Sequence, residues 1–251
     1  MSVKINPYTL QDKNILVTGA SSGIGRQIAI SSSLMGGNII ITGRNADRLQ
    51  ETFTLLNSDG KHTLIQADLV VQEEVEKVVN EVGILDGAVL CAGSGVTVPV
   101  KFAKRDKFQK VFDINFFSQI ELIRLLFKKK KLSTNSSIVI IDSIGGTHDI
   151  SIGSIVYGTS KAALMSAMKY CAQEFAQQQI RINCICPGMV ETPLIHRGTI
   201  TEEQLKDDME RYPLKRYGKP EEVAYMAIYL LSDASAWVTG QDFVIDGGIT
   251  I

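Results

Sequence analysis

Cysteine and histidine are scarce in this chain, and neither is grouped. The 251 residues include four cysteines with no Cys-x-x-Cys pair, and the histidines lie far apart, at His62, His148 and His196. Metal sites need several such ligands at short spacings, and disulfide frameworks need a regular set of paired cysteines. We therefore expect no metal site and reduced thiols, as in a cytoplasmic protein.

Long apolar runs and an excess of charge of either sign are also missing. No stretch approaches the roughly 20 apolar residues of a membrane-spanning helix, and the N-terminal residues form no apolar leader. The 26 basic and 27 acidic residues give a net charge of −1, which argues against nucleic acid or a membrane surface as a partner. The exception is the run Lys128–Lys131, a composition that suits a helix C-terminus. We expect a soluble cytoplasmic protein that acts on a small molecule.

The chain does contain a regular alternation of short apolar segments with helical ones. Strands separated by helices indicate βαβ units and a parallel sheet covered by helices on both faces. No repeat or linker divides the chain, so we predict one doubly wound, Rossmann-like α/β domain over residues 1–251. The predicted strands are 14–18, 38–42, 62–67, 85–91, 137–142, 181–186 and 243–245, and the predicted helices are 23–35, 46–56, 73–82, 102–130, 155–178 and 221–231.

A glycine-rich turn joins the first predicted strand to the first predicted helix. Residues 18–25 read Thr-Gly-Ala-Ser-Ser-Gly-Ile-Gly. Glycines at such a turn let the backbone approach a pyrophosphate, whose charge is favoured by the helix N-terminus. Ligands of doubly wound sheets bind beyond the carboxyl ends of the strands, where Gly93, Ser143 and Pro187 also follow predicted strands. The turn therefore predicts a dinucleotide site.

The end of the second predicted strand indicates which nicotinamide cofactor is bound. An acid there would accept hydrogen bonds from the ribose 2′-hydroxyl of NAD, whereas the 2′-phosphate of NADP needs a basic residue. The chain has Gly43-Arg44-Asn45 at this point and no acid. Because a guanidinium pairs well with phosphate, we predict NADP(H) with Arg44 at its 2′-phosphate.

Tyr157 and Lys161 are four residues apart in a predicted helix, so their side chains share one face. A free phenol is a poor proton donor or acceptor at neutral pH, but a neighbouring ammonium favours the phenolate and makes it useful. The same spacing also arises by chance, with a half-buried Tyr beside a solvated Lys. Its meaning depends on the other motifs of the chain.

Taken together, these motifs resemble the short-chain dehydrogenase/reductase (SDR) family over almost the whole chain, from about residue 13 to 248. The resemblance rests on the order of the motifs as much as on their identity. In chain order they are the glycine turn 18–25, Ala67-Asp68-Leu69, Ala92-Gly93, Asn115, Ser143, Tyr157 with Lys161, Pro187-Gly188, Thr192, Val238-Thr239-Gly240-Gln241 and Asp246-Gly247-Gly248.

The resemblance implies roles for these residues. Tyr157 would protonate the carbonyl oxygen as hydride arrives from the nicotinamide, and Ser143 would orient the same oxygen. Lys161 would support Tyr157 and bind the nicotinamide ribose, while Asn115 would hold a water of a proton relay. The cofactor would be held by Gly19, Ser21, Ser22, Gly23, Ile24, Gly25, Arg44, Asn45, Asp68, Leu69, Ala92, Gly93, Tyr157, Lys161, Pro187, Gly188, Val190 and Thr192.

Two residues depart from the family pattern. Cys91 stands where the family usually has an asparagine that stabilises neighbouring backbone, so the departure should weaken a structural contact and spare the chemistry. Asp142 precedes Ser143, where a serine is common. It would perturb the charges of the site if it pointed inward, or it would bond a loop amide at the strand end.

The substrate is indicated less directly. Residues 212–223 resemble 3-oxoacyl-[acyl-carrier-protein] reductases of fatty acid biosynthesis, but relatives acting on sugars, polyols and hydroxysteroids share this segment. We expect a 3-oxoacyl reductase, with those dehydrogenases as alternatives and a non-catalytic NADP(H) sensor as the alternative of a different class. Acidic acyl-carrier protein is a candidate partner that Lys128–Lys131 would bind beside the active-site edge. The resemblance also implies a dimer or tetramer, a substrate lid at about 189–215, and His148 near the substrate.

Overall fold

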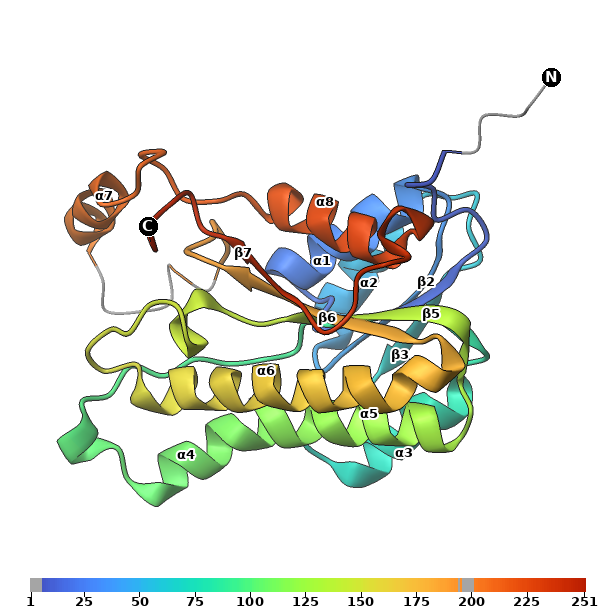
Figure 1. The fold of residues 1–251 in the computed structure, drawn as a ribbon, viewed down its shortest axis with the longest axis horizontal. Coiled ribbons are helices and arrows are strands. Elements are labelled where there is room, and N and C mark those ends of the chain that lie inside the picture. Colours follow the sequence, from blue (N-terminus) through green and yellow to red (C-terminus); the bar gives the residue numbers. More distant parts are fainter. Residues whose placement is uncertain (1–5, 194, 196–200) are drawn as a thin grey trace.

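The computed structural model describes residues 6–193, 195 and 201–251. The undescribed residues 194 and 196–200, which include His196, belong to the predicted substrate lid. Seven parallel strands form one sheet in the order β3-β2-β1-β4-β5-β6-β7 (Figure 1). The strands are β1 Asn14–Thr18, β2 Asn38–Gly43, β3 Thr63–Gln66, β4 Leu85–Leu90, β5 Leu132–Ile141, β6 Arg181–Pro187 and β7 Asp242–Ile245.

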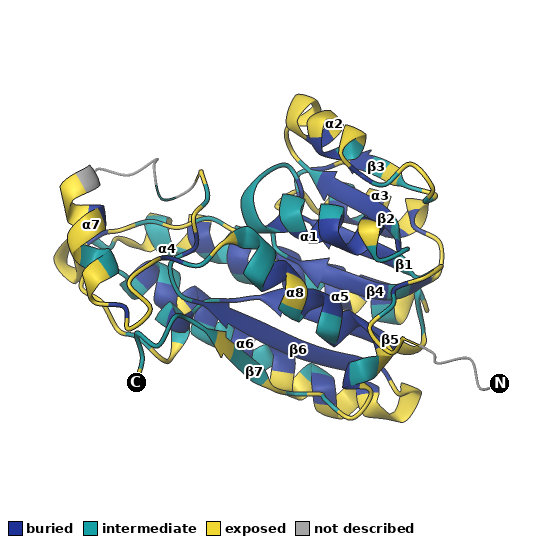
Figure 2. Cartoon of the chain, turned by 90° about the horizontal axis from the view of Figure 1, so that it is seen from above, coloured by how far each residue is buried: buried dark blue, intermediate teal, exposed yellow. Residues whose placement is uncertain are grey.

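The helices cover both faces of the sheet, as Figures 1 and 2 show from two directions. In β1, Leu16 packs into the core on one face, while Ile15 and Val17 pack into the core on the other. The first layer includes α3 (Gln72–Glu81), α5 (Ser118–Lys128) and α6 (Ile155–Phe175). The second includes α1 (Gly23–Leu34), α2 (Ala46–Thr54) and α8 (Pro220–Leu231). The predicted doubly wound α/β fold is confirmed.

The topology determines where a ligand can bind. Strand β1 pairs with β2 on one side and with β4 on the other, so the chain reverses its direction of travel across the sheet at β1. At such a switch point the loops following the two neighbouring strands leave to opposite faces and open a crevice beyond their carboxyl ends. The glycine turn after β1 and the segment after β4 flank this crevice.

Three segments differ from the sequence-based prediction. The helix predicted over 102–130 is divided into α4 (Arg105–Phe112), a π-helical turn (Asp113–Phe117) and α5. Strand β5 begins at Leu132 and not at the predicted residue 137, because Leu132 pairs with Leu85 of β4 ahead of an irregularity in the register. The lid contains a helix, α7 (Glu202–Glu210), started by a capping box between Thr201 and Gln204, a signal that the sequence carries.

The basic run Lys128–Lys131 lies at the edge of the sheet opposite the active-site edge. It follows α5 and leads into the start of β5, and the ammonium groups of Lys129 and Lys131 bind Asn80 Oδ1 and the Val82 carbonyl before β4. The prediction that it borders the active-site edge is therefore wrong, because α5 runs back towards the amino ends of the strands. None of the helices in the described part of the chain combines the length and apolarity needed to span a membrane.

Candidate active site

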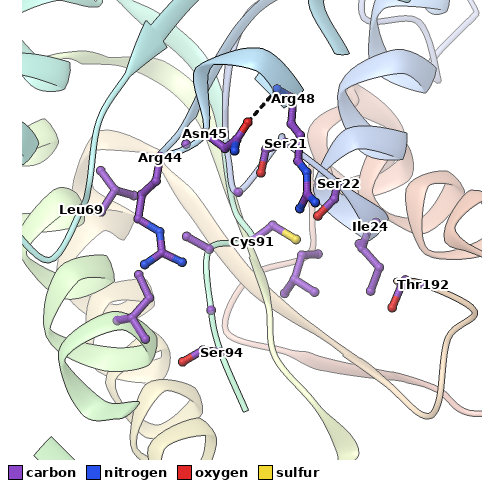
Figure 3. Close-up of a pocket in the computed structure, with 18 of the residues that line it drawn as sticks. Ser21, Ser22, Ile24, Arg44, Asn45, Arg48, Leu69, Cys91, Ser94 and Thr192 are labelled. Atoms are coloured by element: carbon purple, nitrogen blue, oxygen red, sulfur yellow. Dashed lines mark hydrogen bonds between the residues drawn. The ribbon is translucent and has the colours of Figure 1, made fainter. Parts of the chain in front are cut away.

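A cavity of about 640 Å³ lies at the carboxyl edge of the sheet and collects most of the predicted cofactor residues (Figure 3). It lies between the glycine turn, the ends of β2 to β5 and the start of α6. Its wall includes Gly19, Ser21, Ser22, Gly23, Ile24, Gly25, Arg44, Asn45, Asp68, Leu69, Ala92, Gly93, Tyr157, Lys161 and Thr192, together with the unpredicted Gly43, Arg48, Ala67, Cys91, Ser94, Ile114, Ile141, Asp142 and Pro193.

Three predicted cofactor residues lie off the cavity wall and shape it from behind. Pro187 ends β6, the Gly188 amide donates to the Ile245 carbonyl at 2.9 Å, and Val190 is buried and bridged to Gly218. This anchored segment brings Thr192 next to the glycine turn. A Cβ added to Gly23 would lie 3.3 Å from the methyl group of Thr192. The sequence does not show which of these residues line the cavity and which only support it, because all of them belong to one short motif.

The glycine turn has the geometry of an anion cradle. Gly19 has a φ of +65°, and a Cβ on Gly25 would lie only 2.5 Å from the Gly19 carbonyl oxygen. Ser22, at the N-cap of α1, makes no side-chain capping hydrogen bond, and the first turn of α1 contains no acid. The Ser22 side chain therefore does not compete with a ligand for the first amides of the helix, and the helix dipole favours an anion there. These residues fit the pyrophosphate of a dinucleotide.

Two arginines mark one end of the cavity. Figure 3 shows the side chains of Arg44 and Arg48 extending into it on either side of Asn45. The Asn45 side chain caps α2, because its Oδ1 accepts the Arg48 amide at 2.8 Å, and it thereby fixes the first turn of the helix beside the cavity. Arg48 was missed from the sequence: Arg44 precedes the helix, so their four-residue spacing does not by itself place both side chains on one face.

Hydrogen bonds between two side chains and the main chain hold the segment after β4 against the cavity. The Thr18 hydroxyl accepts the amides of Cys91 and Ala92 at 3.0 and 3.2 Å, and Gln119 Nε2 donates to the Ala92 carbonyl at 2.8 Å. Neither Thr18 nor Gln119 was predicted to have this role. Burial raises the pKa of the Cys91 thiol to about 11, so the thiol is neutral at physiological pH.

Tyr157 and Lys161 occupy the first turns of α6, at the end of β5. Lys161 Nζ lies 5.9 Å from the centroid of the Tyr157 ring and donates to the Ile141 carbonyl at 2.8 Å. Ser143 and Tyr157 flank Gly145: a Cβ added there would lie 3.4 Å from Ser143 Oγ and 3.8 Å from Tyr157 Cε1. Ser143, which follows β5, and the α6 residues Tyr157 and Lys161 therefore belong to one cluster.

Asn115 is the fourth predicted catalytic residue, and it is fully buried in the π-helical turn. Its Oδ1 accepts the Ser94 amide at 2.8 Å, and its Nδ2 donates to the Ser94 carbonyl and to Ser160 Oγ at 2.9 and 3.0 Å. Asn115 thereby links the segment after β4 to α6. Both amide hydrogens are used, so a relay water would have to bind an oxygen atom of Asn115.

His148 lies apart from this cluster. Its Nε2 is 3.0 Å from Asp242 Oδ2 on β7, and Lys169 Nζ lies 3.5 Å from the other oxygen of the same carboxylate. The contact with Asp242 ties the loop after Ser143 to the edge strand of the sheet. The predicted contact of His148 with the substrate stays a prediction.

Two buried ionisable groups in the cavity wall, Asp142 and Lys161, interact electrostatically. Burial raises the pKa of Asp142 to about 7, although the charge of Lys161 opposes this rise. Burial acts to lower the pKa of Lys161, but the acidic groups around it (Tyr157, Asp142, Cys91 and Cys184) together outweigh burial, so the pKa is raised. Lys161 is thus charged throughout the physiological range, whereas Asp142 changes its charge near neutrality.

Asp142 should make the protein less stable as the pH rises. Its pKa is 3.8 for a free side chain and about 7 in the folded protein, so between these values the folded state holds a proton that the unfolded state has released. Replacing Asp142 with Asn should therefore stabilise the protein, by up to about 3 kcal/mol more at pH 8 than at pH 5. Urea unfolding at both pH values tests this, with the exposed Asp59→Asn as control. An equal gain at both pH values would contradict it.

Comparison with known proteins identifies the family. A family model described as enoyl-(acyl carrier protein) reductase matches residues 19–250. The chain is 33% identical to a 3-oxoacyl-[acyl-carrier-protein] reductase FabG of Thermotoga maritima, over 96% of this chain and 99% of the relative. It is 32% identical to a tropinone reductase homolog of Arabidopsis thaliana, over 97% of this chain and 95% of the relative.

Solved structures agree. The RhlG/NADP active-site complex of Pseudomonas aeruginosa superposes with a TM-score of 0.91 at 28% identity, covering 98% of this chain and all of that one. The fold and the crevice define a nucleotide-binding oxidoreductase of the Rossmann type. More narrowly, the chain belongs to the short-chain dehydrogenase/reductase family, whose members use a nicotinamide cofactor.

Proposed function

We propose that this oxidoreductase uses NADPH to reduce a ketone to a secondary alcohol and that its substrate is a 3-oxoacyl thioester. One observation carries the proposal. Tyr157 and Lys161 lie in the wall of a cavity that also includes the glycine turn and two arginines, and Ser143 lies next to Tyr157 across Gly145. A proton donor and a nucleotide cradle are thus combined in one crevice.

Each side chain of the cluster has a defined part in the proposed reaction. The bound nicotinamide supplies the hydride. Ser143 Oγ donates a hydrogen bond to the carbonyl oxygen and orients it, and the Tyr157 hydroxyl transfers its proton to that oxygen as negative charge develops there. Lys161, held by the Ile141 carbonyl at 2.8 Å, compensates the charge of the phenolate that remains.

The arginines favour NADPH over NADH. Arg44 and Arg48 both line the cavity after β2, and residues 43–45 include no acid that would select a 2′-hydroxyl. Two guanidinium groups match the charge and the oxygen geometry of a 2′-phosphate. The RhlG relative, whose solved complex contains NADP, supports the same assignment.

Replacing Gly43 with Asp and Arg44 with Ile should shift the cofactor preference towards NADH. A Cβ at position 43 would meet only side chains, at 3.5 Å and beyond, so the new carboxylate has room at the end of β2. Charge-assisted hydrogen bonds contribute roughly 1.5–3 kcal/mol, so the ratio of kcat/KM for NADPH over NADH should fall by about 100-fold. Arg105→Ile on α4, off the cavity, is the control. An unchanged preference would remove Arg44 from the phosphate site.

The acyl assignment rests on two similarities. The chain resembles the Thermotoga 3-oxoacyl reductase over nearly its full length, and residues 212–223 match that group of reductases. A panel of acetoacetyl-coenzyme A, keto-sugars and ketosteroids, each with NADPH and NADH, tests it. Turnover confined to the sugars or steroids would contradict the acyl assignment and leave the reductase assignment intact. Cofactor binding without hydride transfer to any of these ketones would indicate a sensor instead.

A further inference from the structure

Asp142 lines the cavity, but the proposed reaction gives it no part. It follows Ile141, whose carbonyl holds Lys161, and precedes Ser143. The residue is 4% exposed and lines the cavity. Neither carboxylate oxygen makes a hydrogen bond of good geometry within residues 6–193, 195 and 201–251, although the Ser143 amide lies close enough to favour the charged form. An isolated buried carboxylate costs several kcal/mol, so its neighbours decide in which charge state it exists.

Four titratable groups face Asp142 from three elements. They are Lys161 on α6, Cys184 and Cys186 on β6, and Asp242 on β7. Burial raises the pKa of Cys186 to about 12 and places the pKa of Cys184 well above its ordinary value, so both thiols are neutral. The charges around Asp142 are therefore those of Lys161 and of Asp242.

Asp242 is already paired elsewhere, because its carboxylate contacts His148 and Lys169 at 3.0 and 3.5 Å. Lys161, by contrast, interacts electrostatically with both Tyr157 and Asp142. The ammonium group is thus coupled to two acids, Tyr157, which would react with substrate, and Asp142, which is buried directly after β5. A change in the charge of Asp142 must therefore alter how strongly Lys161 favours the phenolate form of Tyr157.

We propose that Asp142 is a positioning residue whose ionisation controls how strongly Lys161 favours the phenolate of Tyr157. The proposal rests on the proposed function, because it assigns Tyr157 as the proton donor. When the carboxyl group is neutral, the Lys161 charge acts on Tyr157 alone. When it is ionised, Lys161 has two anionic partners, and the second negative charge opposes formation of the phenolate.

The sign of the effect follows from the direction of the reaction. Ketone reduction needs a protonated Tyr157, and an ionised Asp142 keeps the phenol protonated to higher pH. Burial raises the pKa of Asp142 to about 7, so the carboxylate is present at alkaline pH. Asp142 should extend reduction towards alkaline pH.

The test is the pH profile of kcat/KM for ethyl acetoacetate with NADPH. In Asp142→Asn, the alkaline loss of activity should move to lower pH by about one unit, as expected for removal of one nearby charge in a partly buried site. Asp142→Ser should do the same if the Asn variant does not fold. Asp242→Asn is the matched control, because Asp242 faces Asp142 but is not among the groups that act on Lys161. Its profile should keep the wild-type alkaline midpoint.

A second readout separates this inference from the proposed function. Ultraviolet difference titration of the protein without substrate, wild type minus Tyr157→Phe, reports the phenolate of Tyr157. The same subtraction in the Asp142→Asn background should show phenolate formation at lower pH by a similar amount. If ethyl acetoacetate is not reduced, this shift still supports the role of Asp142 while the proposed function fails. A folded Asp142 variant that leaves the phenolate titration unmoved overturns the inference.

Discussion

Replacing Tyr157 with Phe is expected to lower kcat for ketone reduction by about 100- to 10,000-fold, the usual contribution of a positioned proton donor. The substitution removes one hydroxyl and keeps the ring, which packs against Gly145 and beside Lys161. Cofactor binding should change little, because the glycine turn and the arginines that hold the phosphates are untouched. The loss should therefore appear in kcat and leave the Kd for NADPH within a few-fold of wild type.

Steady-state kinetics together with a fluorescence titration of NADPH would measure both quantities. Tyr170→Phe is the matched control, because Tyr170 lies on the same helix but is 72% exposed and lies off the cavity wall. It should retain wild-type kcat. Should Tyr157→Phe keep more than a tenth of the wild-type kcat, another group would have to donate the proton.

The second large effect is expected from Gly25→Ala. The added Cβ would lie 2.5 Å from the Gly19 carbonyl oxygen, 2.9 Å from its carbonyl carbon and 3.1 Å from the Thr18 carbonyl oxygen. All three atoms are backbone, so the overlap cannot be relieved by rotating a side chain. The turn would have to open, which costs roughly 1–3 kcal/mol and displaces the amides that would face the pyrophosphate.

Affinity for NADPH should accordingly fall by about 10- to 100-fold, with a lower melting temperature of the free protein. Calorimetric titration and thermal unfolding measure the two effects. Gly83→Ala is the control for glycine replacement as such, because a Cβ there meets no atom within 4 Å. It should leave cofactor affinity unchanged. Wild-type affinity in Gly25→Ala would show that the turn does not contact the cofactor.

The divided helix over residues 102–130 illustrates where sequence reasoning stops. The apolar pattern indicates a helix across the whole range, but it carries no signal for the π-helical turn at Asp113–Phe117. That turn is the place where Asn115 bonds to Ser94 and Ser160, which lie 21 and 45 residues away in sequence. A local pattern cannot report contacts between segments that meet only after the sheet has formed.

Asp142 makes the same point for the site. The sequence shows an acid before Ser143, and two outcomes were open: a contact with a loop amide or a charge within the site. The structure favours the second, because the carboxyl group is 4% exposed, lies in the cavity wall and interacts electrostatically with Lys161. Burial is a property of packing, and the charge state of a carboxyl group follows from its burial.

Local periodicity was sufficient for the parts of this protein that depend on short-range geometry. The alternation of strands and helices, the tight glycine turn after the first strand and the shared helical face of Tyr157 and Lys161 all follow from residues a few positions apart. Tertiary structure alone decided that Lys128–Lys131 lies on the far edge of the sheet, that Arg48 joins Arg44 in the cavity and that Asp142 is buried beside Lys161. All three placements depend on distances between separate elements. These distances are set by the order of the strands in the sheet and by the edge of the sheet at which each helix begins or ends.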